Sequence, residues 1–245
     1  MRGTSLDNFI SSINKWTETV KRDFTKTFIT GNGWKLFLKG LGITIQISIF
    51  AALLGVAIGL IVAVMRLSRK KNGENTVFSL IAGIYIDIIR GTPAVVQLLI
   101  MYNIVLISIQ NKVMIAIITF GINSGAYVAE IIRAGIQAVD KGQTEAARSL
   151  GLPKRMAMQY VVIPQAIKNV LPALGNEFIV LLKETAIVGY VALMDLTKAG
   201  DFIVSRTYSA FMPLIGTAVI YFVIIKILTV LLGAFERRLQ RSDSR

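Results

Sequence analysis

The sequence predicts an all-α integral membrane protein in which five transmembrane helices follow an amphipathic helix. Three observations lead to this fold class. The chain is 54% hydrophobic and 17% charged over 245 residues, with a mean hydropathy of +0.63, which is too apolar for a soluble domain of this length. Apolar runs long enough for a bilayer recur along it. The formal charge of +13 gathers at the edges of these runs, as it does beside membrane spans.

The residue types that are missing exclude most enzyme chemistries. The sequence has neither cysteine nor histidine, which rules out disulfides, thiolate nucleophiles, zinc-thiolate sites and histidine-based catalysis or metal binding. It also lacks the G-x-x-x-x-G-K-[S/T] phosphate loop. We therefore expect no catalytic site, no metal and no cofactor in this chain. Because the positive charge follows the span edges, we expect membrane lipid and not nucleic acid as its charged surroundings.

Residues 1–33 are predicted to form an amphipathic helix ahead of a five-span domain, residues 34–245. Apolar residues recur at steps of three and four, with basic residues between them. The apolar run of about 7–15 residues that a cleavable signal needs is missing. A basic amphipathic helix with Trp and Phe on its apolar side is typical of the membrane interface. Packing on the protein's own flank is the alternative, and the sequence does not decide between them.

The first predicted span, residues 40–65, has no charged residue and can cross a hydrocarbon layer of about 30 Å. Small side chains recur on it at every fourth position: Ala51, Gly55, Gly59 and Ala63. Such a stripe lets a neighbouring helix approach closely, so we interpret it as a packing surface. The basic segment 66–73 that follows should lie in the cytoplasm.

Residues 76–109 stay apolar for longer than one upright span requires. Pro93 should break this run, because proline lacks a backbone donor and disfavours helix at the residue before it. We expect an interfacial helix on which Asp87 and Arg90 form an anchoring pair, followed by a second span over residues 93–107.

The third predicted span, residues 113–139, carries a polar face. Asn123, Tyr127 and Glu130 are spaced by four and three residues, so they share one side of a helix. Glu130 lies roughly 15 Å into the membrane by helical rise. An ionisable group at that depth faces a partner or a water-filled cavity. Two compatible interpretations remain: the lining of a polar pathway, or a structural pair with Arg133 on the next turn.

Residues 140–170 form a polar and basic interruption between two apolar blocks. Thr144 is a suitable N-cap, and Gly151 suits the end of the short helix that Thr144 would begin. Pro153 suits the first turn of a second helix, and Pro164 marks its end or a bend. The sequence therefore predicts two short helices that meet at a fixed angle.

The first of these short helices is predicted to carry an exposed surface. We expect Ala146 and Ala147 to face outward, where their minimal side chains let another surface approach the backbone. Basic residues flank them: Arg148, Lys154 and Arg155. A charged loop that merely connects two spans is the alternative, because short motifs produce many false matches.

The fourth predicted span, residues 173–193, carries side chains that are rare in lipid: Asn176, Glu177, Lys183, Glu184 and Thr185. Lys183 and Glu184 would point about 100° apart on a helix. Each therefore needs a partner on another helix, and Glu130 and Arg133 are the candidates.

Residues 194–213 are interpreted as an external loop and residues 214–235 as the fifth span. Five spans with the basic clusters inside place the amino terminus outside and the carboxyl terminus in the cytoplasm. The basic residues among the first 39 positions oppose this orientation, because the same rule pulls them inward.

The loop resembles a known element. The resemblance is carried by Glu145, Ala146, Ala147, Gly151, Val161, Ile163 and Pro164, of which Val161 and Ile163 stand where the known pattern has Ile and Leu. This pattern is similar to the EAA loop of bacterial ABC importer permeases, where the ATPase subunit docks. The segments IRGTP at 89–93, NSGAYVAEIIRAGIQAVDKGQ at 123–143 and PQAIKNVLPALGNEF at 164–178 resemble the polar amino acid branch of these permeases. Ala186 departs from the hydroxyl residue usual in that branch.

The resemblance implies a type I ABC importer permease in a bacterial cell membrane. It implies a second permease subunit, identical or related, two cytoplasmic ATPase subunits that bind Mg-ATP, and an external solute-binding protein. The implied coupling residues are Glu145, Ala146, Ala147, Arg148, Gly151 and Pro153. As substrate contacts we expect Asn123, Tyr127, Glu130, Asn176, Lys183 and Thr185, because a zwitterionic amino acid needs both complementary charges. An importer for another small polar solute, a passive channel and a membrane enzyme are the alternatives.

Overall fold

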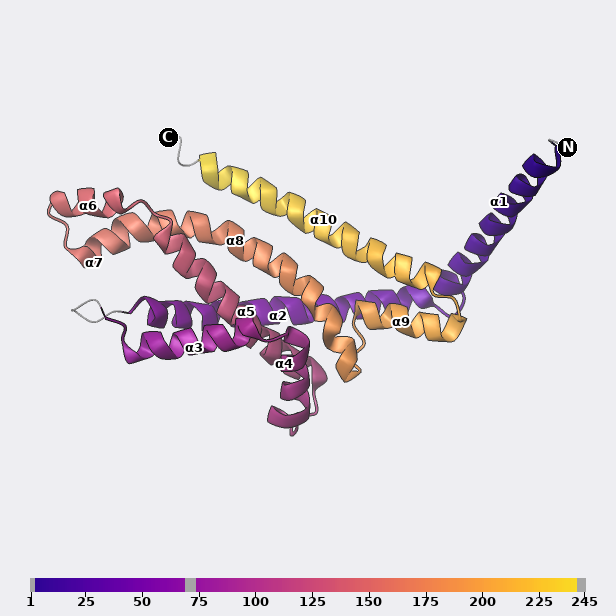
Figure 1. The fold of residues 1–245 in the computed structure, drawn as a ribbon, viewed down its shortest axis with the longest axis horizontal. Helices are drawn as coiled ribbons and strands as arrows, with labels where there is room; N and C mark the ends of the chain where they lie inside the picture. Colours follow the sequence, from indigo (N-terminus) through magenta and orange to yellow (C-terminus); the bar gives the residue numbers. More distant parts are fainter. Residues whose placement is uncertain (1–2, 69–73, 242–245) are drawn as a thin grey trace.

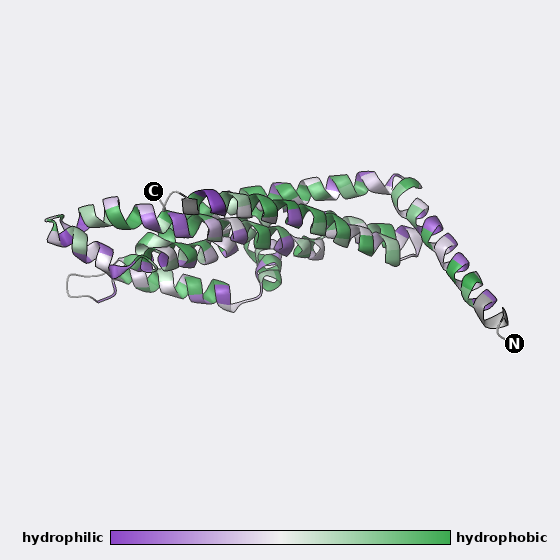
Figure 2. Cartoon of the chain, turned by 90° about the horizontal axis from the view of Figure 1, so that it is seen from above, coloured by the Kyte–Doolittle hydropathy of each residue, from purple (hydrophilic) through white to green (hydrophobic). Residues whose placement is uncertain are grey.

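The computed structural model describes residues 3–68 and 74–241, which form an elongated bundle of helices joined by short connections (Figure 1). Helix α2 (Gly33–Leu67) runs along most of the bundle. Residues of high hydropathy make up much of the helices (Figure 2), and many of their large apolar side chains are exposed. Exposed apolar surface on this scale is what a lipid environment requires, so the predicted all-α membrane class is confirmed.

Helix α5 (Lys112–Gln137) packs closely against α2 through small residues of both helices. Gly55 and Gly59 are buried on α2, and a Cβ atom on Gly59 would lie 2.5 Å from the Cγ1 atom of Val128. On α5, a Cβ atom on Gly125 would lie 2.8 Å from the Cγ2 atom of Ile58. The predicted packing role of the small-residue stripe is therefore confirmed.

Replacing Gly59 with valine is expected to destabilise the protein by about 1–3 kcal/mol, because the added methyl groups overpack the α2–α5 contact. Gly42→Val is the matched control, since Gly42 lies on the same helix and a Cβ atom there would meet no atom within 4 Å. Thermal unfolding of the two purified variants in detergent measures the difference. Equal unfolding temperatures would contradict the close packing of α2 on α5.

The apolar run 76–109 breaks where proline predicts it. Helix α3 (Val77–Gly91) ends before Pro93, and α4 (Ala94–Ile100) with the π-helical η2 (Met101–Val105) continues at 105° to it. The second span expected at 93–107 is wrong as a separate crossing, because seven and five helical residues rise only about 18 Å. The bent pair as a whole is the candidate membrane element.

Helix α3 is not the separate interfacial helix that the sequence predicts. One of its faces is buried against α2 and α5, and that face consists of Ser79, Ala82, Gly83 and Ile86. The Arg66 guanidinium of α2 donates to the Ser79 carbonyl at 3.2 Å. These mostly small side chains let α3 pack against α2 and α5. The residue pattern of α3 alone does not predict this packing.

The polar interruption folds into α6 (Lys141–Ser149), α7 (Lys154–Ala157), the π-helical η3 (Met158–Val162) and α8 (Ile163–Glu184). Pro164 does not end a helix, which was one of its two predicted roles, because the chain passes from η3 into α8 without a break. A π-helical turn beside a proline lets neighbouring backbone groups find other partners. Helix α8 ends at Glu184 and the 3₁₀ helix η4 (Thr185–Val191) follows, so the predicted fourth span is not one continuous α-helix.

The segment interpreted as an external loop contains helix α9 (Leu196–Thr207), and that interpretation is corrected. Asp195 caps α9 by accepting from the backbone amides of Thr197 at 3.0 Å and Lys198 at 2.8 Å. The Leu196 amide donates to the Thr44 hydroxyl of α2 at 3.1 Å. Helix α9 is thereby attached to the same end of α2 as the chain's amino-terminal part (Figure 1).

Among the described residues, three helices are long and apolar enough to cross a membrane. They are Gly33–Leu67, Lys112–Gln137 and the part Phe211–Leu239 of α10 (Phe211–Arg241). The bent pair of α3 and α4 makes a fourth. Helix α8 falls short because its polar and charged side chains lower its hydropathy. Length and composition therefore identify three spans, or four with the bent pair, and not all of the five that the sequence predicts.

Helix α1 (Gly3–Phe24) and the π-helical η1 (Thr25–Ile29) project from the end of the bundle opposite α6 and α7 (Figure 1). The apolar side chains Phe9, Ile13 and Trp16 are exposed by 63%, 46% and 64%. In this structure α1 does not cover the protein's own flank, which was one of the two alternatives. Its apolar face is left free for surroundings outside this chain.

Candidate functional site

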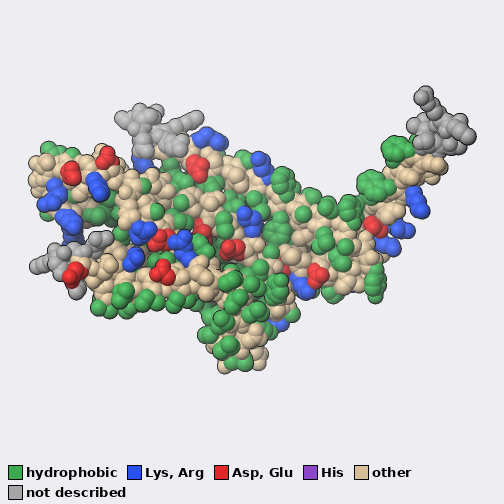
Figure 3. All heavy atoms as spheres, in the orientation of Figure 1, with side chains coloured by type: hydrophobic (Ala, Val, Ile, Leu, Met, Phe, Trp, Pro, Cys, Tyr) green, Lys and Arg blue, Asp and Glu red, His purple; other side chains and the backbone are tan. Residues whose placement is uncertain are grey.

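Two regions contain the residues that the sequence predicts to be functional: the hairpin of α6 and α7 at one end of the bundle, and a group of charged and amide side chains among α3, α4, α5 and α8. Figure 3 shows acidic and basic side chains gathered in the half of the molecule that contains these helices. We describe the hairpin first, because its geometry follows directly from local sequence.

The hairpin begins earlier than the sequence predicts. Asp140, and not Thr144, caps α6, with its carboxylate accepting from the Gly142 amide at 2.9 Å. The end is predicted correctly: Gly151 has φ +89°, and the Leu152 amide donates to the Ala147 carbonyl at 3.1 Å. This is the hydrogen-bond pattern of a Schellman motif, which requires the left-handed conformation that glycine adopts without strain.

Pro153 directly precedes α7 as its N-cap residue. Its fixed φ suits a helix start, and its missing N–H leaves no donor unsatisfied there. The turn between α6 and α7 is therefore determined at both ends, by Gly151 and by Pro153. The predicted turn between two helical segments is confirmed, but the second segment is not a short helix, because α7 continues through η3 into α8.

The predicted coupling residues differ in their exposure. Glu145, Ala146, Arg148 and Gly151 are exposed. Ala147 is only 5% exposed, because α6 packs against η3 and α7. The expectation that both alanines face outward is therefore wrong for Ala147, whose small size instead lets α6 approach its neighbours.

The outer face of this hairpin combines apolar and basic side chains. Leu150 is 85% exposed, Met156 41% and Met158 37%. Beside them lies an open cleft of about 710 Å³ lined by Lys154, Arg155, Met158, Gln159 and Ile163. Exposed apolar residues rimmed by charge mark a protein interaction surface. We call the exposed residues 145–159 the hairpin surface.

The interior group is centred on Glu130 of α5. The Arg133 guanidinium donates to both carboxylate oxygens of Glu130, Nε to Oε1 at 2.9 Å and Nη2 to Oε2 at 2.7 Å. This confirms the pair predicted from their spacing. A guanidinium that binds both carboxylate oxygens fixes the geometry of the pair as well as its charge.

Arg90 of α3 joins the same group. Its Nη1 atom lies 3.7 Å from the Glu130 Oε2 atom, and its guanidinium lies 5.3 Å from the centre of the Tyr127 ring. The expected anchoring pair of Asp87 and Arg90 is therefore wrong for Arg90, which points to α5. Asp87 itself is exposed. One carboxylate thus contacts two guanidinium groups.

Amide side chains hold the bend of α3 and α4 against α5. The Gln97 amide nitrogen donates to the Ile89 carbonyl and the Thr92 hydroxyl, both at 2.8 Å. Its oxygen accepts from the amide of Asn123 at 2.9 Å. Asn123 is only 3% exposed. Its hydrogen-bonding capacity is partly taken up inside the protein, and Gln97 is a polar contact that the sequence interpretation missed.

The predicted contacts on α8 occupy other environments. Asn176 and Lys183 are exposed, whereas Thr185 is fully buried and donates to the Leu182 carbonyl at 2.8 Å. Thr185 is thus closed to a solute in this structure. The link from α5 to α8 is instead the hydrogen bond from the Ser124 hydroxyl to Glu177 at 3.0 Å. We expected Lys183 and Glu184 to pair with Glu130 or Arg133. This is wrong, because Glu130 and Arg133 pair with each other.

Comparison with known proteins places these features in context. A family model described as "Binding-protein-dependent transport system inner membrane component" matches residues 55–241. A putative glutamine transport system permease protein of Rickettsia typhi is 39% identical over 205 residues, which cover 82% of this chain and 92% of the relative. The arginine transport system permease protein of Bacillus subtilis is 40% identical over 209 residues, 84% and 93% of the two chains.

A solved structure has the same fold. It is described as "Crystal structure of an amino acid ABC transporter with histidines", and one of its chains superposes on the present chain with a TM-score of 0.77 at 51% identity. The match covers 83% of this chain and 94% of that chain. About a sixth of the present chain therefore lies outside the match, although the match takes in almost all of the solved chain.

Proposed function

Because the chain belongs to the family of binding-protein-dependent transport system inner membrane components, we propose that it is the permease subunit of an ATP-driven importer for polar amino acids. The observation that carries this proposal is the hairpin of α6 and α7, whose turn is fixed by Gly151 and Pro153 and whose outer face is apolar with a basic rim. Relatives named for glutamine and arginine transport support the solute class.

The work of transport is divided among several chains in this proposal. The sequence lacks a phosphate loop, so a separate ATPase subunit binds Mg-ATP and hydrolyses it. That subunit docks on the hairpin surface through Glu145, Ala146, Arg148 and Gly151, while Ala147 acts from inside by letting α6 pack. A second permease subunit, identical or related, completes the path, and an external solute-binding protein delivers the solute.

The orientation follows from the docking site. The hairpin surface faces the cytoplasm, where ATP is available. The carboxyl-terminal end of α10 points toward the same half of the bundle as the hairpin, and α1 leaves at the opposite end (Figure 1). The amino terminus therefore lies outside and the carboxyl terminus in the cytoplasm of a bacterial cell membrane.

The solute passes beside the charged interior group. Tyr127, Glu130 and Arg90 lie close together on α5 and α3, and Asn123 extends this face toward α4. A zwitterionic amino acid can pair its ammonium with Glu130 and its carboxylate with a guanidinium. Asn176 and Lys183 are exposed on α8, and we propose that they contact the solute from the side of α8 that faces the path. Thr185 is no longer proposed as a substrate contact, because it is buried.

Reconstitution tests the proposal directly. The chain is co-expressed with its neighbouring transporter genes, purified as a complex and placed in liposomes with the solute-binding protein. Uptake of labelled glutamine or arginine should require internal Mg-ATP. Uptake without ATP would identify a passive channel. Binding assays on the solute-binding protein can identify a different solute. ATP-dependent uptake of that solute, and not of amino acids, would show that the proposed substrate class is wrong.

A further inference from the structure

A cleft of about 390 Å³ lies where η1 and the start of α2 meet the end of α9. It is lined by Lys26, Thr27, Thr30, Gly31, Gly33, Leu36, Ile203, Arg206, Thr207 and Tyr208. Two cationic and several hydroxyl side chains thus surround one opening. No residue of the interior group or of the hairpin surface takes part in it.

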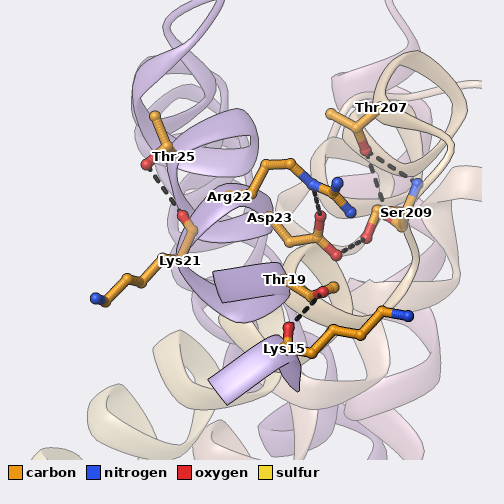
Figure 4. Close-up of polar contacts among 8 residues, drawn as sticks. All are labelled: Lys15, Thr19, Lys21, Arg22, Asp23, Thr25, Thr207 and Ser209. Carbon is orange, nitrogen blue, oxygen red and sulfur yellow. Dashed lines mark hydrogen bonds and ion pairs between the residues drawn. The ribbon is translucent and has the colours of Figure 1, made fainter. Parts of the chain in front are cut away.

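The walls of this cleft are held by specific contacts. The Asp23 carboxylate accepts from the Ser209 hydroxyl at 2.8 Å, which ties the end of α1 to the turn after α9 (Figure 4). Gly31 has φ +79°, and a Cβ atom there would lie 3.1 Å from the Arg206 Nη2 atom. Only glycine therefore lets the chain turn this closely beneath the Arg206 guanidinium.

The charge of the cleft is uncompensated. Within residues 3–68 and 74–241, neither Lys26 nor Arg206 takes part in an ion pair, and the Arg206 guanidinium lies 5.8 Å from the centre of the Phe202 ring. The Thr27 hydroxyl in the cleft wall is also the buried side-chain polar atom without a hydrogen-bond partner in this part of the chain. Buried polar groups normally have partners. The cleft thus offers two cationic side chains that have no ion-pair partner in this part of the chain, whereas its Thr207 hydroxyl already donates to the Ile203 carbonyl at 2.8 Å.

The position of the cleft corresponds to the headgroup layer of a membrane. Its α2 residues precede the charge-free run that begins at Gly40 by four to seven positions, or about 6–10 Å of helical rise, close to the thickness of about 5–8 Å that the interfacial layer adds on each side. Both tryptophans of the sequence are exposed. Trp34 lies between the lining residues Gly33 and Leu36 in the sequence, and Trp16 precedes the lining residue Lys26 on the same amino-terminal part of the chain. Tryptophan is enriched at this depth.

We propose that this cleft binds the phosphate group of an anionic membrane lipid. Lys26 and Arg206 pair with the phosphate and the Thr30 hydroxyl donates to one of its oxygens. The acyl chains lie along Ile29, the neighbour of Thr30 in the sequence, whose side chain is 63% exposed. The bound lipid fixes the junction of α1 with the bundle. This proposal does not depend on which solute is transported.

Tryptophan quenching tests the proposal on the full-length protein in mild detergent. Phosphatidylglycerol with brominated acyl chains is titrated at about 0.15 M salt, and quenching of Trp16 and Trp34 reports its arrival. The variant Lys26→Gln with Arg206→Gln is expected to need at least about tenfold more lipid for half-maximal quenching, because each basic group contributes about 1 kcal/mol to anionic lipid binding. Lys26→Gln alone is expected to show part of this loss, and its exposed side chain makes it safe for folding.

The matched control removes the same charge from α1 outside the cleft, by Lys15→Gln with Lys21→Gln. Both side chains are exposed and neither lines the cleft. Because neither lysine lines the cleft, the control should lose clearly less affinity than the double cleft variant. Equal losses in both double variants, or no loss in either, would overturn the proposal in favour of general surface attraction or of no site.

A separate arm distinguishes lipid from free phosphate. Inorganic phosphate at about 10 mM should neither raise the unfolding temperature of the wild type nor reverse quenching by phosphatidylglycerol. If phosphate raises the unfolding temperature and reverses the quenching for the wild type, but has no effect on either cleft variant, the cleft takes a soluble phosphate and the lipid assignment is wrong. If the purified solute-binding protein displaces the lipid, the cleft is part of a protein interface and the lipid assignment also fails.

Discussion

The variant Glu130→Gln is expected to lose transport by at least about tenfold and stability by about 1.5–3 kcal/mol, the range for hydrogen bonds to charged groups. Glutamine keeps the size of the side chain but removes the charge that two guanidinium groups share. Arg133 and Arg90 would then face each other without a carboxylate between them. Thermal unfolding in detergent and ATP-dependent uptake in liposomes measure the two effects separately.

The control Gln137→Ala removes an uncharged partner from the same group. Gln137 accepts from the Arg133 Nη1 atom at 2.7 Å on the exposed side of α5, where water can take its place, so its loss should cost less than the loss of the Glu130 charge. Combining Glu130→Gln with Arg90→Gln removes one of the facing charges and should restore part of the stability. If Glu130→Gln has the unfolding temperature and the uptake rate of the wild type, Glu130 has neither the structural nor the pathway role given to it.

The interior group shows which contacts a sequence pattern can predict. Glu130 and Arg133 lie three residues apart on one helix, so their pairing follows from helical geometry. The contact of Arg90 with Glu130 and Tyr127 depends on how α3 is turned against α5, and that turn depends on packing of small residues from separate segments. The position of the break at Pro93 was predictable, but the 105° angle and its direction were not.

Helix boundaries show the same limit at a smaller scale. Thr144 and Asp140 are both good N-cap residues, and the choice of Asp140 adds one turn to α6. The segment of α9 resembles a loop in sequence because its charged residues, Asp195, Lys198, Asp201 and Arg206, balance one another. Its signal was present in the sequence: Asp195 as N-cap, followed by Leu196, Ala199 and Ile203, which share one buried face.

Gly151→Val is expected to abolish ATP-driven uptake while the protein still inserts and folds. The left-handed conformation of Gly151, with φ +89°, costs an L-residue roughly 1–2 kcal/mol, and a β-branched side chain resists it most. Valine would therefore open the Schellman turn and change the angle between α6 and α7. Uptake and ATP hydrolysis by the reconstituted complex are measured together, since a misplaced hairpin should leave hydrolysis without transport.

Gly151→Asn separates the two reasons for which glycine can be needed here. Asparagine tolerates the left-handed conformation, and a Cβ atom at this position would meet no atom of this chain within 4 Å. If glycine serves only the turn, the asparagine variant transports nearly normally. If the ATPase approaches the backbone where the side chain would lie, asparagine fails as valine does, although both fold. Normal uptake by the valine variant would contradict the docking role of the hairpin, because no rigid turn would then be needed to pass force from the ATPase into η3 and α8.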